Sequence, residues 1–139
     1  MTSEWFWKLH AASVFFMCGA IWIVQWVHYP LMQFVEGSRF SEFHAVHSKR
    51  ITAVVLPPML LQLATAMALV LSPEAHEGPM NRWVALGLTF GVFLSTALLS
   101  VPCHSKLASG FQAKVHQHLV ATNWPRTLFW SLHASLLLF

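Results

Sequence analysis

The segment Phe40-Ser-Glu-Phe-His44-Ala-Val-His47-Ser-Lys-Arg-Ile51 places two histidines three positions apart, directly before a long apolar run. Residues at positions i and i+3 of a helix lie on one face, with Cβ atoms about 5–6 Å apart. The spacing therefore predicts two imidazoles on one helical face, which suits two ligands of one metal ion or one ligand and its neighbour. The apolar run that follows predicts a helix that continues into a membrane.

The composition of the chain excludes an ordinary soluble domain. Of its 139 residues, 56% are hydrophobic and 9% are charged, whereas about 25% are charged in soluble domains. A spanning helix needs roughly 17–25 apolar residues. Three uncharged stretches have this length and a fourth is interrupted by Arg126; they cover residues 9–27, 51–73, 83–105 and 115–139. We therefore predict one integral-membrane domain over residues 1–139, with the all-α fold of an antiparallel four-helix transmembrane bundle.

Lysine and arginine set the predicted orientation, because cytoplasmic loops carry an excess of these residues. Six of the eight lie near the connections after the first and third apolar stretches, and two lie on the opposite side: Arg39, Lys49, Arg50, Lys106, Lys114 and Arg126 against Lys8 and Arg82. We expect the connections after the first and third stretches in the cytoplasm and both termini outside it. The net charge of +3 comes with no nucleic-acid-binding signature.

Histidines gather at the predicted cytoplasmic ends of the apolar stretches. His28 closes the first stretch, His104 closes the third, and His116 opens the fourth. If the stretches alternate across the bilayer, these three meet His44 and His47 at one membrane face. Buried imidazoles at close range must pair, bind a metal ion or stay neutral, and all-imidazole ligation suits copper, iron or zinc. We predict that the five rings form a transition-metal site.

For any one of these histidines taken alone, an interfacial side chain with a hydrogen bond is the better interpretation, and the convergence of five favours the metal site. Two of the nine histidines are expected to have no role. His76 falls in the predicted outer turn, and His118 lies on the far side of the helical wheel of the fourth stretch.

Arg126 is the charged residue within a predicted span, which makes it a functional hypothesis by default. Its alternative role is to extend to the membrane interface. Asn123 lies one turn before it, and both belong to one stripe with His116, Leu119, Trp130 and His133. We predict that Arg126 and Asn123 form a catalytic pair that holds an anionic or quinone-like oxygen. Glu36 and Glu42 are candidates for orienting a ligand ring.

His10 and His133 form a second pair near the predicted outer ends of the first and fourth helices. Because His10 precedes His28 by 18 residues, the two sets lie roughly 27 Å apart along the helix axis. The outer pair is expected to share a hydrogen bond or a water, or to bind a haem between them. Trp7 and Trp130 crowd that region, so we expect a structural pair and place the cofactor at the inner cluster.

Motifs along most of the chain are His28-Tyr-Pro, Phe43-His44-x-x-His47-x-x-Arg50-Ile51, Pro57-Pro58-Met59, Val101-Pro102-x-His104 and His116-x-x-Leu119-Val-x-Thr-Asn123-Trp-x-Arg126. In these the chain resembles a family of small bacterial four-span membrane proteins of unsettled function. Together with the predicted orientation, this resemblance implies a bacterial inner-membrane protein with both termini in the periplasm. It is also distantly similar to the anthrone-oxygenase-like membrane proteins, which implies oxidation of a lipophilic aromatic compound. Trp5-x-x-Lys8-Leu9-His10 resembles the first-helix entry of a four-span haem-binding protoporphyrinogen oxidase family, which implies a haem.

These patterns predict a metal-dependent membrane oxidoreductase that acts on a lipophilic or quinone-like substrate. A haem-binding redox protein that uses His10 and His133 is one alternative. The other is a non-catalytic subunit of a larger membrane complex or a homo-oligomer, in which the histidines serve packing.

Overall fold

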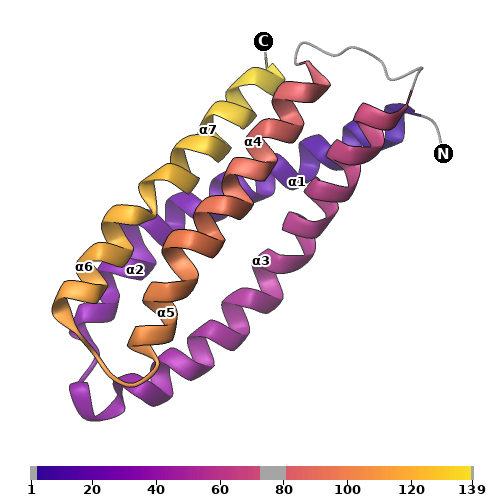
Figure 1. The fold of residues 1–139 in the computed structure, drawn as a ribbon. Helices are drawn as coiled ribbons and strands as arrows, with labels where there is room; N and C mark the ends of the chain where they lie inside the picture. The colour runs from indigo at the N-terminus through magenta and orange to yellow at the C-terminus, as the bar shows by residue number, and fades with distance from the viewer. Residues whose placement is uncertain (1–2, 73–80, 139) are drawn as a thin grey trace.

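Four helical segments pack side by side in the computed structural model, which describes residues 3–72 and 81–138 (Figure 1). The first comprises α1 (Ser3–Ile23), the π-helical turn Val24–His28 and α2 (Tyr29–Leu31), and the second is α3 (Phe40–Leu71). The third comprises α4 (Arg82–Ser95), the π-helical turn Thr96–Ser100 and α5 (Val101–Leu107). The fourth comprises α6 (Ala113–Thr122) and α7 (Trp124–Leu138). Two short 3-10 turns, Met32–Phe34 and Gly37–Arg39, link the first segment to the second.

The segments form a four-cornered bundle. Helices α1 and α4 each pack against both α3 and α7, so that α1 lies diagonally opposite α4. The start of α1 and the end of α7 lie at one end of the bundle, and the α5–α6 connection lies at the other (Figure 1). This arrangement confirms the predicted all-α, antiparallel four-helix fold.

The outer surface of the bundle is apolar. Large hydrophobic side chains such as Trp26, Phe90 and Leu128 are exposed on three different segments. Within the described residues, three helical segments are long and apolar enough to cross a membrane: Glu4–Phe34, Gly37–Leu71 and Arg82–Leu107. Helices that are hydrophobic outside as well as inside are typical of membrane spans, and these properties are compatible with an integral membrane protein.

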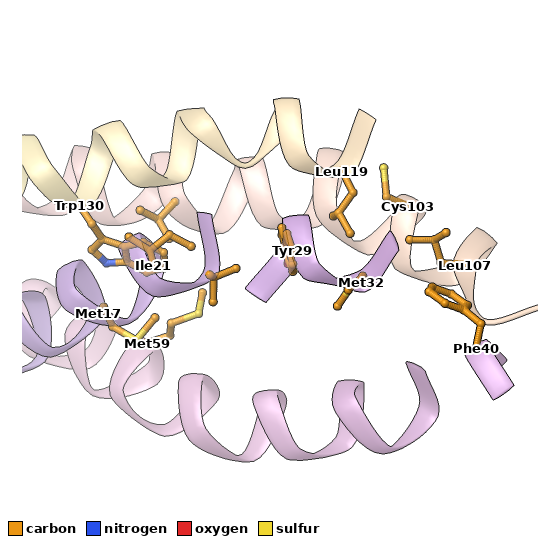
Figure 2. Close-up of a cluster of buried hydrophobic side chains, with 12 residues drawn as sticks. Met17, Ile21, Tyr29, Met32, Phe40, Met59, Cys103, Leu107, Leu119 and Trp130 are labelled. Atoms are coloured by element: carbon orange, nitrogen blue, oxygen red, sulfur yellow. The ribbon is translucent and has the colours of Figure 1, made fainter. Parts of the chain in front are cut away.

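One cluster of buried apolar side chains runs along the bundle axis (Figure 2). Near Trp130 the cluster contains Ile21, Met17 and Met59, and towards the other end it contains Met32, Phe40, Cys103, Leu107 and Leu119. The Tyr29 side chain lies between these two ends (Figure 2). The described residues also bury polar side chains, such as Gln25, Gln62 and Asn123.

Each π-helical turn directly precedes an X-Pro pair, Tyr29-Pro30 in one case and Val101-Pro102 in the other. The backbone N–H of Tyr29 donates to the Val24 carbonyl, and that of Val101 donates to the Thr96 carbonyl, five residues back in both cases. Proline has no N–H and its ring clashes with the carbonyl four residues earlier in a regular helix. The wider turn accommodates the proline, and the chain stays helical beyond it.

The first π-helical turn changes which residues face the bundle axis. A regular helix would place His28 on the same face as His10, five turns away. Instead Gln25 and Tyr29 are buried, and His28 is only half-buried. The inserted residue of a π turn rotates the following residues about the helix axis.

The fourth segment was expected to be one continuous helix, but α6 and α7 are separated by Asn123. The interruption is minimal, because Asn123 keeps helical dihedral angles and its N–H donates to the Leu119 carbonyl at 3.1 Å. The buried stripe therefore stays in register; it comprises His116, Leu119, Asn123, Arg126, Trp130 and His133. His118 is exposed on the opposite side, as predicted. His76 lies outside the described residues.

Candidate functional site

A layer of polar side chains near the N-terminal end of α1 joins all four segments. His10 and His133 are fully buried, and their Nε2 atoms lie 3.0 Å apart. His10 Nδ1 lies 3.1 Å from Thr65 Oγ1, and His133 Nδ1 lies 3.3 Å from Gln62 Nε2. The Gln62 amide also donates to Thr89 Oγ1 at 3.1 Å. We call these residues, together with Trp130, the outer polar layer.

The hydrogen bonds of the outer polar layer assign one neutral tautomer to each ring. The Thr65 hydroxyl donates to the Leu61 carbonyl at 2.7 Å, so its oxygen accepts from His10 Nδ1–H. His10 Nε2 is then an acceptor for His133 Nε2–H, and His133 Nδ1 accepts from the Gln62 amide. Trp130 Nε1 donates to Gln62 Oε1 at 3.0 Å. Every polar atom of the two rings is satisfied.

This geometry bears on the haem alternative. A metal–nitrogen bond is about 2 Å long, so two nitrogens on opposite sides of an iron lie about 4 Å apart. The Nε2 atoms of His10 and His133 are 3.0 Å apart and bind each other directly. A haem between the two rings would have to separate these nitrogens by about 1 Å more and break their hydrogen bond.

At the other end of the bundle, four of the five predicted ligand histidines converge from three segments. His28 Nε2 lies 2.7 Å from His47 Nδ1, and His44 Nε2 lies 3.1 Å from His104 Nδ1. The two pairs are neighbours, since the ring centroids of His47 and His104 are 6.1 Å apart. We call these four residues the inner histidine cluster.

His116 is buried but makes different contacts. Its Nε2 donates to the Tyr29 carbonyl at 2.8 Å, and its ring packs against Phe111 with centroids 5.3 Å apart. That carbonyl follows the first π-helical turn, so His116 ties α6 to α2. His116 therefore lies outside the inner histidine cluster, with one ring nitrogen bound to the backbone.

Within residues 3–72 and 81–138, no group of three or more His, Cys, Asp or Glu side chains is arranged to hold a metal ion. The cluster nitrogens instead pair at 2.7 and 3.1 Å. Two nitrogen ligands of one tetrahedral ion, each about 2.0–2.1 Å from it, lie about 3.3 Å apart. Each pair is therefore within about 1 Å of the spacing that two ligands of one ion need.

A directional chain of hydrogen bonds connects the inner histidine cluster to Arg126. The guanidinium Nη2 donates to the Tyr29 hydroxyl oxygen at 3.2 Å, and a guanidinium can only donate. The phenol proton is then available to His104 Nε2 at 3.0 Å. His104 Nδ1–H in turn donates to His44 Nε2. The chain crosses from α7 through α2 and α5 to α3.

Arg126 is held by Asn123 but has no anionic partner. Its Nη2 also donates to Asn123 Oδ1, and the Asn123 amide donates to Gln25 Oε1 at 2.8 Å. Asn123 is fully buried, so it positions the guanidinium. Arg126 itself is 8% exposed, and among the described residues it forms no ion pair with a carboxylate.

Glu36 and Glu42 do not orient the rings in the way the sequence suggested. Glu36 Oε1 accepts from the Ser38 hydroxyl at 2.7 Å, and both carboxylates are exposed. Neither forms a hydrogen bond with a histidine ring in the part of the chain that the structure describes. They line an interfacial pocket of about 730 Å³ together with His28 and His47.

A second cavity of about 260 Å³ is lined by residues of all four segments, and we call it the internal cavity. His104 and Tyr29 contribute to its wall, together with Arg126 from α7. His28 and His47 line the interfacial pocket and His104 lines the internal cavity, so the inner histidine cluster lies between the two.

Unsatisfied polar atoms concentrate in this half of the bundle. Four buried side-chain atoms of the described residues have no hydrogen-bond partner: His47 Nε2, Ser48 Oγ, Ser100 Oγ and Arg126 Nε. Such orphaned groups are costly and call for an explanation at each position. Three of the four residues line the internal cavity, and the fourth belongs to the inner histidine cluster.

The most informative residues that sequence reasoning missed are Tyr29 and Gln25. Tyr29 is the only tyrosine of the chain, and Gln25 is an uncharged polar residue within an apolar stretch. Both features are visible in the sequence. Their burial depends on the π-helical turn, which the apolar periodicity does not reveal.

Fold and site together define a class: an all-α four-helix bundle with membrane-length helices, a satisfied polar layer at one end and, at the other, an imidazole cluster with one buried ring nitrogen that has no partner. Comparisons with models of known protein families, with curated proteins and with solved structures find no match. The resemblance to the anthrone-oxygenase-like proteins therefore stays a prediction.

Proposed function

We propose that the protein is a membrane oxidoreductase that acts on a lipophilic, quinone-like substrate through a transition metal ion bound by the inner histidine cluster. The observation that carries the proposal is the contrast between the two polar layers. In the outer polar layer every ring nitrogen is hydrogen-bonded. In the inner half His47 Nε2 is buried without a partner, beside three further imidazoles.

The ring arrangement supports an all-imidazole metal site. The ring centroids of His28 and His47 are 4.3 Å apart, and those of His44 and His104 are 5.3 Å apart. Imidazole ligands suit copper, iron and zinc. Because zinc has no redox chemistry of its own, an oxidoreductase with this site uses copper or iron.

The location of the cluster fits a substrate that arrives from the membrane. The cluster lies at the end of the bundle near Arg39 and Arg50, which line the interfacial pocket. The excess of Lys and Arg near this end supports a cytoplasmic location for the cluster in a bacterial inner membrane, with both termini in the periplasm.

The test is element analysis of the purified protein and of two single variants. His47→Ala removes a ring of the cluster, and His118→Ala removes an exposed ring of α6. We expect close to stoichiometric copper or iron in the wild type and in His118→Ala, and a loss of most of it in His47→Ala. Equal metal content in both variants would contradict the proposed metal site.

A further inference from the structure

We propose that the internal cavity is the binding site of a lipophilic ring compound with a carbonyl or phenolate oxygen, and that Arg126 and Ser100 contact that oxygen. The proposal deepens the proposed function, on which it rests only for the statement that the bound compound is also the substrate. Neither the binding site nor its polar contacts depends on a metal ion.

The cavity has one apolar part and one polar part. Its apolar wall is formed by core side chains from three segments: Met17, Ile21 and Val24 from the first, Met59 from α3, and Trp130 from α7. Its polar lining includes Tyr29, Ser48, Ser100, His104 and Arg126. Ligand sites commonly combine an apolar lining with a few polar groups that fix orientation. A ring compound with an oxygen at one edge matches this division.

Arg126 defines what kind of atom the polar part binds. The guanidinium is more than nine-tenths buried and has no carboxylate partner among the described residues. Its Nη2 is used by Tyr29 and Asn123, but its Nε–H has no acceptor. A buried, unpaired charge is costly. A ligand oxygen that accepts from Nε–H offsets this cost, and an oxygen with negative charge offsets it most.

Ser100, the last residue of the second π-helical turn, supplies a second contact. A serine in a helix commonly donates to the carbonyl four residues earlier, as Ser105 does to Val101 at 3.0 Å. Ser100 makes no such hydrogen bond to the Thr96 carbonyl. The Ser100 hydroxyl is buried and lines the cavity without a partner. It is therefore available to a ligand.

The size and position of the cavity restrict the ligand further. A volume of about 260 Å³ lies just below the roughly 300–1,000 Å³ of sites for drug-sized molecules. It suits a head group of one or two rings. Exposed residues of two segments also line it, Thr52 of α3 and Val101 and Ser105 of α5. The cavity therefore opens between α3 and α5, on the apolar surface.

The experiment measures binding of 2-methyl-1,4-naphthoquinone to the purified protein in detergent by calorimetry. The control ligand is 2-methylnaphthalene, which keeps the rings and lacks both oxygens. Arg126→Gln tests the guanidinium, and Ser100→Ala tests the hydroxyl. Ser135→Ala is the matched control, because Ser135 is exposed on α7 and donates to the Ser131 carbonyl away from the cavity.

We expect the quinone to bind the wild type and Ser135→Ala equally, at least tenfold more weakly to Arg126→Gln, and several-fold more weakly to Ser100→Ala. The hydrocarbon should bind weakly and equally to all four proteins. Equal quinone affinity in all four, or hydrocarbon binding as tight as quinone binding, overturns the proposal. If Arg126→Gln does not fold, the comparison of Ser100→Ala with Ser135→Ala decides the outcome.

His47→Ala separates this inference from the proposed function. Quinone binding that persists in this variant without metal supports the cavity as a site independent of the cluster. If the wild type binds metal but binds the quinone no more tightly than the hydrocarbon, the proposed metal centre is kept and the proposed cavity site is rejected.

Discussion

Arg126 and Tyr29 meet across the bundle, where the guanidinium Nη2 donates to the phenol oxygen at 3.2 Å. The contact joins α7 to the segment just after the first π-helical turn. It also places a phenol proton between a fixed cation and His104, 3.0 Å away. Tyr29 therefore connects the internal cavity to the inner histidine cluster, both electrostatically and through a transferable proton.

Tyr29→Phe should separate the structural from the chemical role of this contact. The ring remains, but Arg126 loses one acceptor and His104 Nε2 loses its donor. Leaving buried polar groups unsatisfied costs about 1–3 kcal/mol, so we expect destabilisation of that order in a folded protein. Thermal unfolding in detergent measures this destabilisation. Quinone turnover should fall by more than the loss of folded protein explains. Turnover equal to that of the wild type contradicts a role for the phenol proton.

Two further histidine variants should distinguish ligand from support. His104→Ala removes a ring of the inner histidine cluster, whereas His116→Ala removes a ring that donates to the Tyr29 carbonyl. We expect His104→Ala to lose most of the bound metal and His116→Ala to retain it while becoming less stable. Metal content and thermal unfolding are measured on the same samples. If His116→Ala instead loses its metal at unchanged stability, the result favours the five-ligand site expected from the sequence.

The two glycines of α4 make a matched pair for helix packing. A Cβ added at Gly91 would lie 3.1 Å from the Phe129 ring of α7, whereas one at Gly87 would meet nothing within 4 Å. Overpacking a well-filled contact costs typically about 1–3 kcal/mol. We therefore expect Gly87→Ala to be stabilised by about 0.5–1 kcal/mol in thermal unfolding, because alanine is the better helix former, and Gly91→Ala to be less stable than Gly87→Ala by about 1 kcal/mol, because the Phe129 ring must shift. The reverse ranking would show that α4 and α7 do not pack in this register.

Apolar length and spacing were sufficient to predict the four segments, their antiparallel order and the buried stripe of α6 and α7. They also predicted that His10 and His133 face each other, because both lie near the same end of antiparallel helices. Such patterns give the face of a helix. They do not give the hydrogen-bond partner, so the contact between His116 and the Tyr29 carbonyl could not be predicted.

The remaining site residues depend on backbone geometry that periodicity does not encode. Tyr29 faces the bundle axis because a π-helical turn adds one residue before Pro30. Ser100, the last residue of the second π-helical turn, has a buried hydroxyl without a partner. The dipeptides Tyr29-Pro30 and Val101-Pro102 were visible in the sequence, but their effect on the helical register appears only in three dimensions.

The outer polar layer gives a test that distinguishes a metal centre from a haem protein. His10 and His133 hydrogen-bond to each other at 3.0 Å, and Thr65 and Gln62 satisfy their remaining nitrogens. The purified protein should therefore show no Soret band. His133→Ala should leave His10 Nε2 without a partner and should leave an empty space beside it. These two effects together lower the stability by about 2–5 kcal/mol. The metal content of the inner histidine cluster should stay unchanged. Optical spectra, element analysis and thermal unfolding of the two proteins make the comparison. A strong Soret band in the wild type that is lost in His133→Ala would instead assign the outer pair to a haem and make the inner cluster secondary.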